Sequence, residues 1–344
     1  MLKEKKELED IVRLFNSGKI YLAYSRINDL LKNNSENLDV IYCHAQLSLK
    51  LNKIDISIKS YLKALSIRPN DVNLINRISS IYLSQNKLDK AAIYNDKSLL
   101  INKDNLKANI DKAYILYEKK EYNKSEEYIN ISIQKDPKNY FSQNLNGLIF
   151  IKKNKIRNAI NCFEKAIKIN PDYPDSYNNL GTCYYKLENL TKAFFYYKLS
   201  YKINDKDLKT ISNIANTLSL IGKNKLAIKF YDKALNIDPN NNEILSNLAL
   251  NYFRMRDLKN SKKYFEKFIN LGIIDNDLSY AYSTLLLNTN SFKDGWQYFE
   301  KRLLIKKNIK NLKNFIDYKN KTLNVSDLYP EENLLVLREQ GIGE

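Results

Sequence analysis

The sequence predicts an all-α solenoid built from helix-turn-helix units, and three observations support this fold class. Four prolines, Pro69, Pro137, Pro171 and Pro239, are separated by 34 residues or by twice 34. Two columns of small residues recur at the same step. The 344 residues include only 8 Gly and 6 Pro, which is low for a turn-rich all-β fold, while 44% hydrophobic residues is ordinary for a globular protein.

The columns of small residues define the repeat. Each unit is expected to contain two amphipathic helices of about 12 to 14 residues, with apolar residues at i, i+3, i+4 and i+7. A small residue in each helix would let the two helices approach closely. The column in the first helix consists of Ala45, Ser79, Ala113, Gly147, Gly181, Ala215, Ala249 and Ser283. The column in the second helix consists of Ala23, Ser57, Ala91, Ser125, Ala159, Ala193, Ala227, Ser261 and Gly295.

This register gives about eight to nine repeats without any insertion. The repeats start near residues 4, 38, 72, 106, 140, 174, 208, 242 and 276, so we expect a repeat array over residues 4–309. Because no single unit can bury its apolar face alone, neighbouring units must stack to form a core. In the first unit, Ile11 and Leu30 occupy columns that are mostly small elsewhere, as expected for a terminal unit with one neighbour.

The best-preserved unit, residues 174–207, resembles the tetratricopeptide-repeat (TPR) pattern, with Tyr in place of the usual Trp. The residues that carry the resemblance are Tyr177, Leu180, Gly181 and Tyr184, followed by Ala193 and Tyr197. The resemblance implies a right-handed TPR superhelix whose first helices line a long concave surface. Such a surface would bind a protein or an extended peptide.

Residues suited to catalysis are scarce. The only histidine is His44, and the three cysteines, Cys43, Cys162 and Cys183, are scattered. These residues provide no nucleophile–base pair and no zinc-ligand spacing, so we predict no enzyme activity, cofactor or metal. Three scattered cysteines are too few for a disulfide framework, so we expect them to be reduced, as in a cytoplasmic protein. No run of 18 apolar residues occurs, and no transmembrane segment is expected.

A recurring asparagine predicts where a peptide would bind. Asn179, Asn213 and Asn247 recur at a step of 34 in the first helices, in a column that we call the ladder column. An amide both donates and accepts hydrogen bonds, so a column of amides can hold the backbone of an extended peptide. The other residues expected to line this groove are Asn178, Thr182, Tyr185, Ser212, Asn216 and Ser246.

The ladder column is similar to the asparagine ladder in the superhelix of O-GlcNAc transferases, and the match covers three units. Earlier units carry Cys43, Arg77, Asp111 and Leu145 in this column, which interrupts a continuous ladder. The alternative interpretation is that Asn recurs here because it is abundant throughout the chain.

The net charge of +17 allows a second function, a basic scaffold that binds RNA or an anionic membrane surface. Abundant Tyr beside Lys suits stacking on single-stranded nucleic acid. However, the lysines are spread along the chain without a block of five or six, and Tyr184 and Tyr197 fall in core columns. Nucleic acid is therefore the less favoured partner. The sequence makes no prediction of oligomeric state.

The repeat pattern ends before the C-terminus. Residues 310–332 are expected to form a polar linker. Residues 333–344, "NLLVLREQGIGE", predict one short buried strand followed by a loop with Gly341 and Gly343. In an α/β domain, such a loop places backbone N–H groups near a phosphate.

Two motifs near the C-terminus resemble a bacterial family in which TPR arrays precede a GT-B-like glycosyltransferase domain. The first comprises Phe292, Gly295, Trp296, Phe299, Glu300 and Arg302. The second comprises Leu334, Leu335, Val336, Glu339, Gln340, Gly341, Ile342 and Gly343. Glu344 stands where Asp is usual in that family. The resemblance implies a partner-recruiting region truncated at the start of its catalytic domain, in which Gly341 and Gly343 are vestigial and bind no cofactor.

Overall fold

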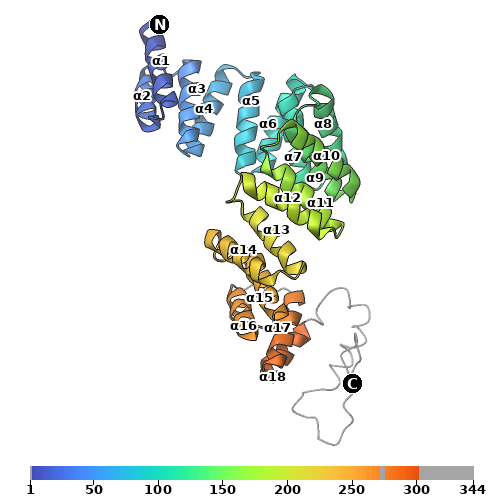
Figure 1. The fold of residues 1–344 in the computed structure, drawn as a ribbon. Helices are drawn as coiled ribbons and strands as arrows, with labels where there is room; N and C mark the ends of the chain where they lie inside the picture. The colour runs from blue at the N-terminus through green and yellow to red at the C-terminus, as the bar shows by residue number, and fades with distance from the viewer. Residues whose placement is uncertain (1, 272–275, 302–344) are drawn as a thin grey trace, which may run out of the picture. The chain divides into compact units, whose positions relative to one another are not determined.

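The computed structural model describes residues 2–271 and 276–301, and every element in this part of the chain is an α-helix (Figure 1). The predicted all-α fold class is confirmed. The predicted linker at residues 310–332, the strand and glycine loop at 333–344 and the motif residue Arg302 lie outside the described residues.

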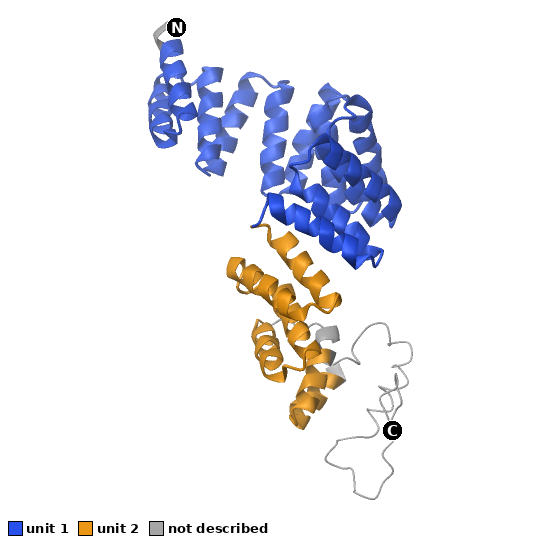
Figure 2. Ribbon diagram, viewed as in Figure 1, with its two compact units in different colours: residues 1–205 blue, residues 206–344 orange. Residues whose placement is uncertain are grey.

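The helices form two compact units, which are described separately (Figure 2). The first unit, residues 1–205, contains α1 (Leu2–Asn16), α2 (Ile20–Asn33), α3 (Leu38–Lys50), α4 (Ile54–Ile67), α5 (Val72–Ser84), α6 (Leu88–Ile101), α7 (Leu106–Glu118), α8 (Tyr122–Lys135), α9 (Tyr140–Lys152), α10 (Ile156–Ile169), α11 (Pro174–Lys186) and α12 (Leu190–Ile203). The second unit, residues 206–344, contains α13 (Leu208–Leu220), α14 (Asn224–Ile237), α15 (Asn242–Arg254), α16 (Leu258–Asn270), α17 (Asn276–Asn288) and α18 (Phe292–Lys301).

Both columns of small residues are buried, as the sequence predicts. At four of the five positions where a column carries Ser, its hydroxyl donates to the carbonyl of the small residue that faces it in the other helix. A buried hydroxyl without a partner would be costly, and this bond removes the cost while the helices remain close. The four such bonds are Ser57 to Ala45 (2.7 Å), Ser79 to Ala91 (3.1 Å), Ser125 to Ala113 (2.6 Å) and Ser261 to Ala249 (3.0 Å).

Two glycines in the first column make room for aromatic rings. A Cβ atom on Gly147 would lie 2.5 Å from the ring of Phe163, and one on Gly181 would lie 2.7 Å from the ring of Tyr197. Carbon atoms in contact prefer about 3.5–4.0 Å. Glycine and ring therefore form a matched pair across the two helices of these repeats.

Helix starts and turns also recur at a step of 34. Most first helices begin after an Asn or Asp whose side chain accepts backbone N–H bonds of the first turn, which satisfies donors that the helix leaves unpaired. These capping residues are Asn37, Asp71, Asn105, Asn139, Asp207 and Asn241. Each turn from a first to a second helix contains one residue with positive φ: Gly18, Asn52, Asn86, Lys120, Asn154, Glu188, Gly222, Arg256 or Asn290.

Within the described part of the chain, no helix is both long enough and apolar enough to cross a membrane.

Candidate functional site

The predicted groove residues lie on three first helices, α11 in the first unit and α13 and α15 in the second. In each of these helices the apolar side chains recur with the 3.6-residue period of an α-helix, so they share one face, which packs on the core. The other side chains lie beside that face.

In the first unit, the asparagine of the ladder column holds two repeats together. Asn179 is 4% exposed, and its Nδ2 donates to Asn144 Oδ1 on α9 at 3.1 Å. Asn144 Oδ1 also accepts from the Ser176 hydroxyl at 3.3 Å. Asn178 is equally buried, with 2% of its surface exposed. The amide groups of α11 are therefore used within the protein.

Thr182 and Tyr185 also lie on α11. The Thr182 hydroxyl donates to the backbone carbonyl of Asn178 at 3.0 Å and accepts from the Tyr197 hydroxyl at 3.2 Å. Tyr185 is half-buried. Thr182 thus ties the second helix of its repeat to the surface of the first.

In the second unit, the structure brings two predicted groove residues together. Asn247 Nδ2 on α15 donates to Asn216 Oδ1 on α13 at 3.1 Å, and the Tyr231 hydroxyl donates to the same oxygen at 2.8 Å. Asn216 and Asn247 are both half-buried. An amide oxygen has two lone pairs, so Asn216 Oδ1 is saturated and its orientation is fixed.

The remaining predicted residues of the second unit do not converge on this pair. The Ser212 hydroxyl donates to the Leu208 carbonyl at 2.8 Å, and the Ser246 hydroxyl donates to the Glu243 carbonyl at 2.9 Å. Both hydroxyls therefore bond back to their own helix. Asn213 is half-buried on α13.

The bond between Asn216 and Asn247 has a charged counterpart in the first unit. At the same positions of an earlier pair of repeats, the Ser80 hydroxyl donates to Asp111 Oδ2 at 3.3 Å. Asp111 is 4% exposed and forms an ion pair with Lys107 at 2.7 Å. Burial raises the pKa of Asp111, and Lys107 and Ser80 oppose that rise. The ladder column therefore carries bonds between repeats in both units.

Sequence reasoning missed Asn144 and Tyr231. Asn144 precedes Asn178 by one repeat step, so that column would have identified it. Tyr231 follows Tyr197 by one repeat step, so the repeat pattern indicates a core position, and its side chain is indeed 1% exposed. No pattern in one-dimensional sequence shows that its hydroxyl reaches across to α13.

The single histidine and the three cysteines do not form a reactive site, and of these four residues His44, Cys162 and Cys183 are buried and Cys43 is half-buried. His44 is 5% exposed and lies within hydrogen-bonding distance of Ser60 Oγ (2.8 Å) and Asn28 Oδ1 (3.0 Å). Burial raises the pKa of the Cys43 and Cys162 thiols to about 11 and that of Cys183 to about 12. Such thiols remain protonated and unreactive at neutral pH. The described residues contain no group of three or more His, Cys, Asp or Glu that could hold a metal ion.

Family comparisons agree with this architecture. A TPR repeat family matches residues 147–188, and a tetratricopeptide repeat family matches residues 39–71, 174–207, 208–241 and 243–271. This chain has a tetratricopeptide-repeat fold. The predicted TPR repeats are confirmed, whereas the resemblance to glycosyltransferase-associated arrays remains a prediction. No curated protein matches the sequence.

Solved structures show the same fold at low identity. The chain is similar to a structure of the APC/C hetero-tetramer Cut9–Hcn1 (TM-score 0.60, 14% identity), which it matches over 83% of its own length and 52% of that chain. It thus spans about half the length of that chain. It is also similar to a tetratricopeptide repeat protein from Parabacteroides merdae (TM-score 0.55, 15% identity, 70% of this chain and 95% of that chain). A third similar structure is PilF from Pseudomonas aeruginosa (TM-score 0.52, 17% identity, 60% of this chain and 94% of that chain).

Proposed function

We propose that this TPR chain is a protein-interaction scaffold that binds an extended peptide or protein segment along its first helices. The observation that carries the proposal is the fixed pair of amides at Asn216 and Asn247. Tyr231 and Asn247 saturate the oxygen of Asn216, so the amide nitrogen of Asn216 is left as a donor. Asn247 donates one of its two amide N–H groups to this bond, and its Oδ1 remains available as an acceptor.

A donor and an acceptor held side by side complement one peptide unit, whose carbonyl accepts and whose N–H donates. Within the described residues, neither Asn216 Nδ2 nor Asn247 Oδ1 has another hydrogen-bond partner. Because both contacts are to the peptide backbone, recognition would tolerate many side chains.

One pair of amides gives weak binding. A neutral hydrogen bond contributes about 0.5–1.5 kcal/mol net, whereas micromolar affinity requires about 8 kcal/mol. The bound segment must therefore be extended and must contact several repeats. The other predicted residues remain part of the proposal within their own units: Asn178, Asn179, Thr182 and Tyr185 on α11 of the first unit, and Ser212, Asn213 and Ser246 on α13 and α15 of the second.

The wider role that we propose is to recruit the substrate or partner of a cytoplasmic TPR glycosyltransferase. The motifs at residues 292–302 and 334–343 support this role. A direct test is whether the chain, fused to a glycosyltransferase domain of the resembling family, changes the choice of protein substrate. An unchanged choice would contradict the recruiting role without affecting peptide binding itself.

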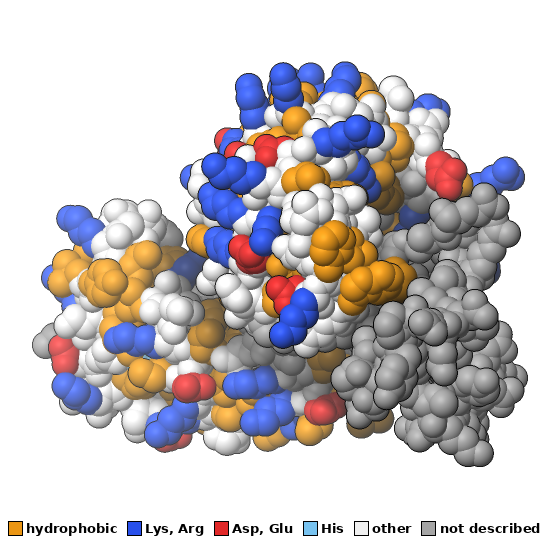
Figure 3. All heavy atoms as spheres, turned by 90° about the horizontal axis from the view of Figure 1, so that it is seen from below, with side chains coloured by type: hydrophobic (Ala, Val, Ile, Leu, Met, Phe, Trp, Pro, Cys, Tyr) orange, Lys and Arg blue, Asp and Glu red, His pale blue; other side chains and the backbone are white. Residues whose placement is uncertain are grey.

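RNA or an anionic membrane is the alternative partner, and two observations favour a peptide. On the face shown in Figure 3, the Lys and Arg side chains are scattered among other residues and form no single block. Several tyrosines stack on each other: Tyr184 and Tyr196 lie 5.4 Å apart with ring planes at 4°, and Lys192 lies over the ring of Tyr184. A ring covered in this way offers little face to a nucleobase.

The experiment is a peptide array of 15-residue segments probed with the purified chain, followed by fluorescence anisotropy on the best binder. We expect Asn216→Ala with Asn247→Ala to weaken binding about tenfold, which corresponds to about 1.4 kcal/mol. Tyr231→Phe, which keeps the ring and removes the orienting hydroxyl, should weaken it less. The matched control is Asn161→Ala, an exposed asparagine on α10. Equal binding by the double variant and the control would refute the amide pair.

A further inference from the structure

The residue before α11 breaks the capping pattern of the first helices. In the first helices from α3 to α15, an Asn or Asp at this position accepts backbone N–H bonds of the first turn, except at α11. There the residue is Tyr173, and its side chain makes no cap. Pro174 follows as the first residue of the helix and has no N–H to be capped. The tyrosine therefore contributes little to the start of this helix, and its ring is available for another role.

A second exception lies on the neighbouring first helix, α9 (Figure 1). Phe141, the second residue of α9, is 46% exposed. From α3 onward, the second residues of the other first helices are all polar or charged: Asp39, Asn73, Lys107, Asp175, Lys209, Glu243 and Asp277. Phe141 therefore places an aromatic ring where the other repeats have a polar side chain.

The two exceptions meet in one aromatic cluster, together with Tyr140. The ring centroid of Tyr173 lies 5.0 Å from that of Tyr140 and 6.0 Å from that of Phe141, with ring planes at 58° and 44°. Rings tilted in this way cover less of each other's faces than stacked rings do. Within the described residues, no Lys or Arg lies over any of the three rings, whereas Lys192 lies over the ring of Tyr184. The cluster therefore keeps an aromatic face available to a cation from another molecule.

Two carboxylates lie beside the cluster. Asp172 and Asp175 are both exposed, and neither forms an ion pair with a residue that the structure describes. Residues 170–175 contain two carboxylates and no cation, and residues 136–141 contain one carboxylate and one lysine, so the two segments together have a net charge of −2. In a chain with a net charge of +17, this is a local surface that attracts a cation.

A hydrogen bond holds one of these carboxylates beside the rings. The Tyr173 hydroxyl donates to Asp175 Oδ2 at 2.8 Å. Burial, and then this hydrogen bond, raises the pKa of Tyr173, so its hydroxyl stays protonated and continues to donate at neutral pH. Asp175 Oδ1 accepts no hydrogen bond from any residue in the described part of the chain. Aromatic rings and a carboxylate oxygen are therefore presented together.

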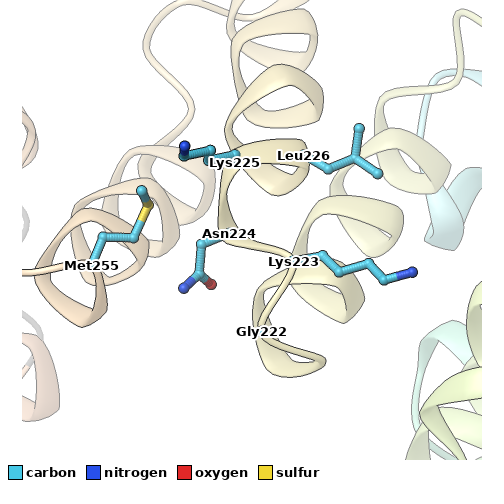
Figure 4. Close-up of a pocket in the computed structure, with 6 residues that line it drawn as sticks. All are labelled: Gly222, Lys223, Asn224, Lys225, Leu226 and Met255. Carbon is cyan, nitrogen blue, oxygen red and sulfur yellow. The ribbon is translucent and has the colours of Figure 1, made fainter.

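The cavity at the turn between α13 and α14 has a different chemistry (Figure 4). It has a volume of about 480 Å³ and is lined by Gly222, Lys223, Asn224, Lys225, Leu226 and Met255. These residues include two lysines but no carboxylate and no aromatic ring, so they neither attract a cation nor stack on one. We therefore expect a cation to bind at the aromatic cluster and not at this cavity.

We infer that Phe141, Tyr173 and Asp175 bind an arginine side chain of the extended segment. The inference rests on the proposed function, to which it adds one side chain of the partner. A guanidinium group is planar, so it stacks on an exposed aromatic face while its N–H groups donate to Asp175 Oδ1. Tyr173 joins the two contacts, because its ring lies beside Phe141 and its hydroxyl bonds to Asp175. A lysine ammonium is more strongly hydrated and lacks the planar match, and RNA is disfavoured because its phosphates would meet two carboxylates.

The test adds three matched peptides to the full chain. Each is a 9-residue peptide of Gly and Ser with blocked ends and one central residue, which is arginine, lysine or citrulline, the neutral isostere of arginine. Ring-¹³C phenylalanine labelling follows the 13 phenylalanines by NMR, and Phe141→Leu identifies the signal of Phe141. We expect saturable shifts of Phe141 with the arginine peptide, a dissociation constant at least threefold higher with the lysine peptide and no shifts with the citrulline peptide. Equal shifts with citrulline and arginine, no saturable shift with any peptide, or tighter binding of a 12-nucleotide oligouridine would overturn the inference.

Variants separate recognition from stability. Asp175→Asn should raise the dissociation constant of the arginine peptide at least fivefold, which corresponds to about 1 kcal/mol. The matched control is Asp39→Asn, at the same position of α3, which should leave binding unchanged. Tyr173→Asn installs the capping residue of other repeats, so the melting temperature should not fall while the dissociation constant rises at least fivefold. Wild-type binding by Tyr173→Asn combined with Asp175→Asn would refute the site.

The amide pair of the second unit gives an independent outcome. Asn216→Ala with Asn247→Ala should leave the shifts of Phe141 unchanged, because the two sites lie in different units. If the arginine peptide shifts Phe141 while the double alanine variant binds array peptides normally, the amide pair fails and the arginine site stands. If array peptides depend on the amide pair but bind equally after arginine is replaced by citrulline, only the arginine site is refuted.

Discussion

The pairing of Gly147 with Phe163 allows a quantitative test of how the repeats pack. In Gly147→Ala the new methyl carbon would lie 2.5, 2.6 and 2.9 Å from three ring carbons of Phe163, a residue that is 0% exposed. Contact at about 3.5 Å requires the ring to move by roughly 1 Å. Overpacking of this kind lowers the free energy of unfolding by about 1–3 kcal/mol. The better helix propensity of Ala offsets about 0.5–1 kcal/mol of this loss.

The expected result is a net loss of about 1–2 kcal/mol in the free energy of unfolding. The chain itself supplies the compensating change, because Ala113 faces Ile129 at the same two positions of an earlier repeat. Gly147→Ala should therefore be tolerated when it is combined with Phe163→Ile. A double-mutant cycle should give a favourable coupling of about 1–2 kcal/mol, well above the 0.3–0.5 kcal/mol expected for independent sites.

The assay is urea unfolding followed by circular dichroism, with hydrogen exchange of the α9 and α10 amides as a local measure. Local exchange is useful because the stability of a repeat array is a sum of nearest-neighbour terms, and unfolding need not be two-state. Additive effects of the two substitutions would show that the ring is free to move. That result would refute the matched pair of glycine and ring.

Three further predictions concern stability. Burial is the main cause that lowers the pKa of His44 below 6.5, and the charge of nearby Lys53 adds to it, so the folded state favours the neutral ring. The free energy of unfolding should therefore fall as the pH drops below 6.5. In thermal melts, His44→Gln should lose this part of the pH dependence. Lys120 has φ of +64°, so Lys120→Gly should stabilise by about 0.5–1 kcal/mol, while Lys119→Gly, at φ of −75°, should destabilise. The Oδ1 atoms of Asn224 and Asn251 are buried, and neither accepts a hydrogen bond from a residue that the structure describes. Asn224→Leu with Asn251→Leu should therefore raise the free energy of unfolding by about 1–3 kcal/mol per relieved amide oxygen, and a lower melting temperature would contradict this reasoning.

The repeat step of 34 predicts much of the fold, because the core depends on which residue types recur. Small residues such as Ala45 and Ser57 had to be buried for two helices to pack closely, and they are. The hydrogen bonds of the candidate site could not be predicted in this way. Asn179 and Asn247 share one column, yet the first bonds to Asn144 and the second to Asn216, at different positions of the preceding repeat. The partner differs because neighbouring columns carry different residue types in different repeats: Leu148 occupies, two repeats earlier, the position of Asn216, and it offers Asn179 no hydrogen-bonding group.

The amide pair of the second unit couples peptide binding to stability. Asn247 joins α15 to α13 through Asn216, so a peptide that bonds to both residues also bridges two repeats. Binding to the folded state alone stabilises it by RT ln(1 + [L]/Kd), which is about 2.7 kcal/mol at a hundredfold excess over Kd. In a repeat protein that energy acts on the interface that the ligand bridges. We therefore expect the bound peptide to slow hydrogen exchange in α13 and α15 and to leave α1 to α4 unchanged. Slower exchange spread evenly over all helices would instead indicate that the peptide binds elsewhere, and the amide pair would then serve only to join the repeats.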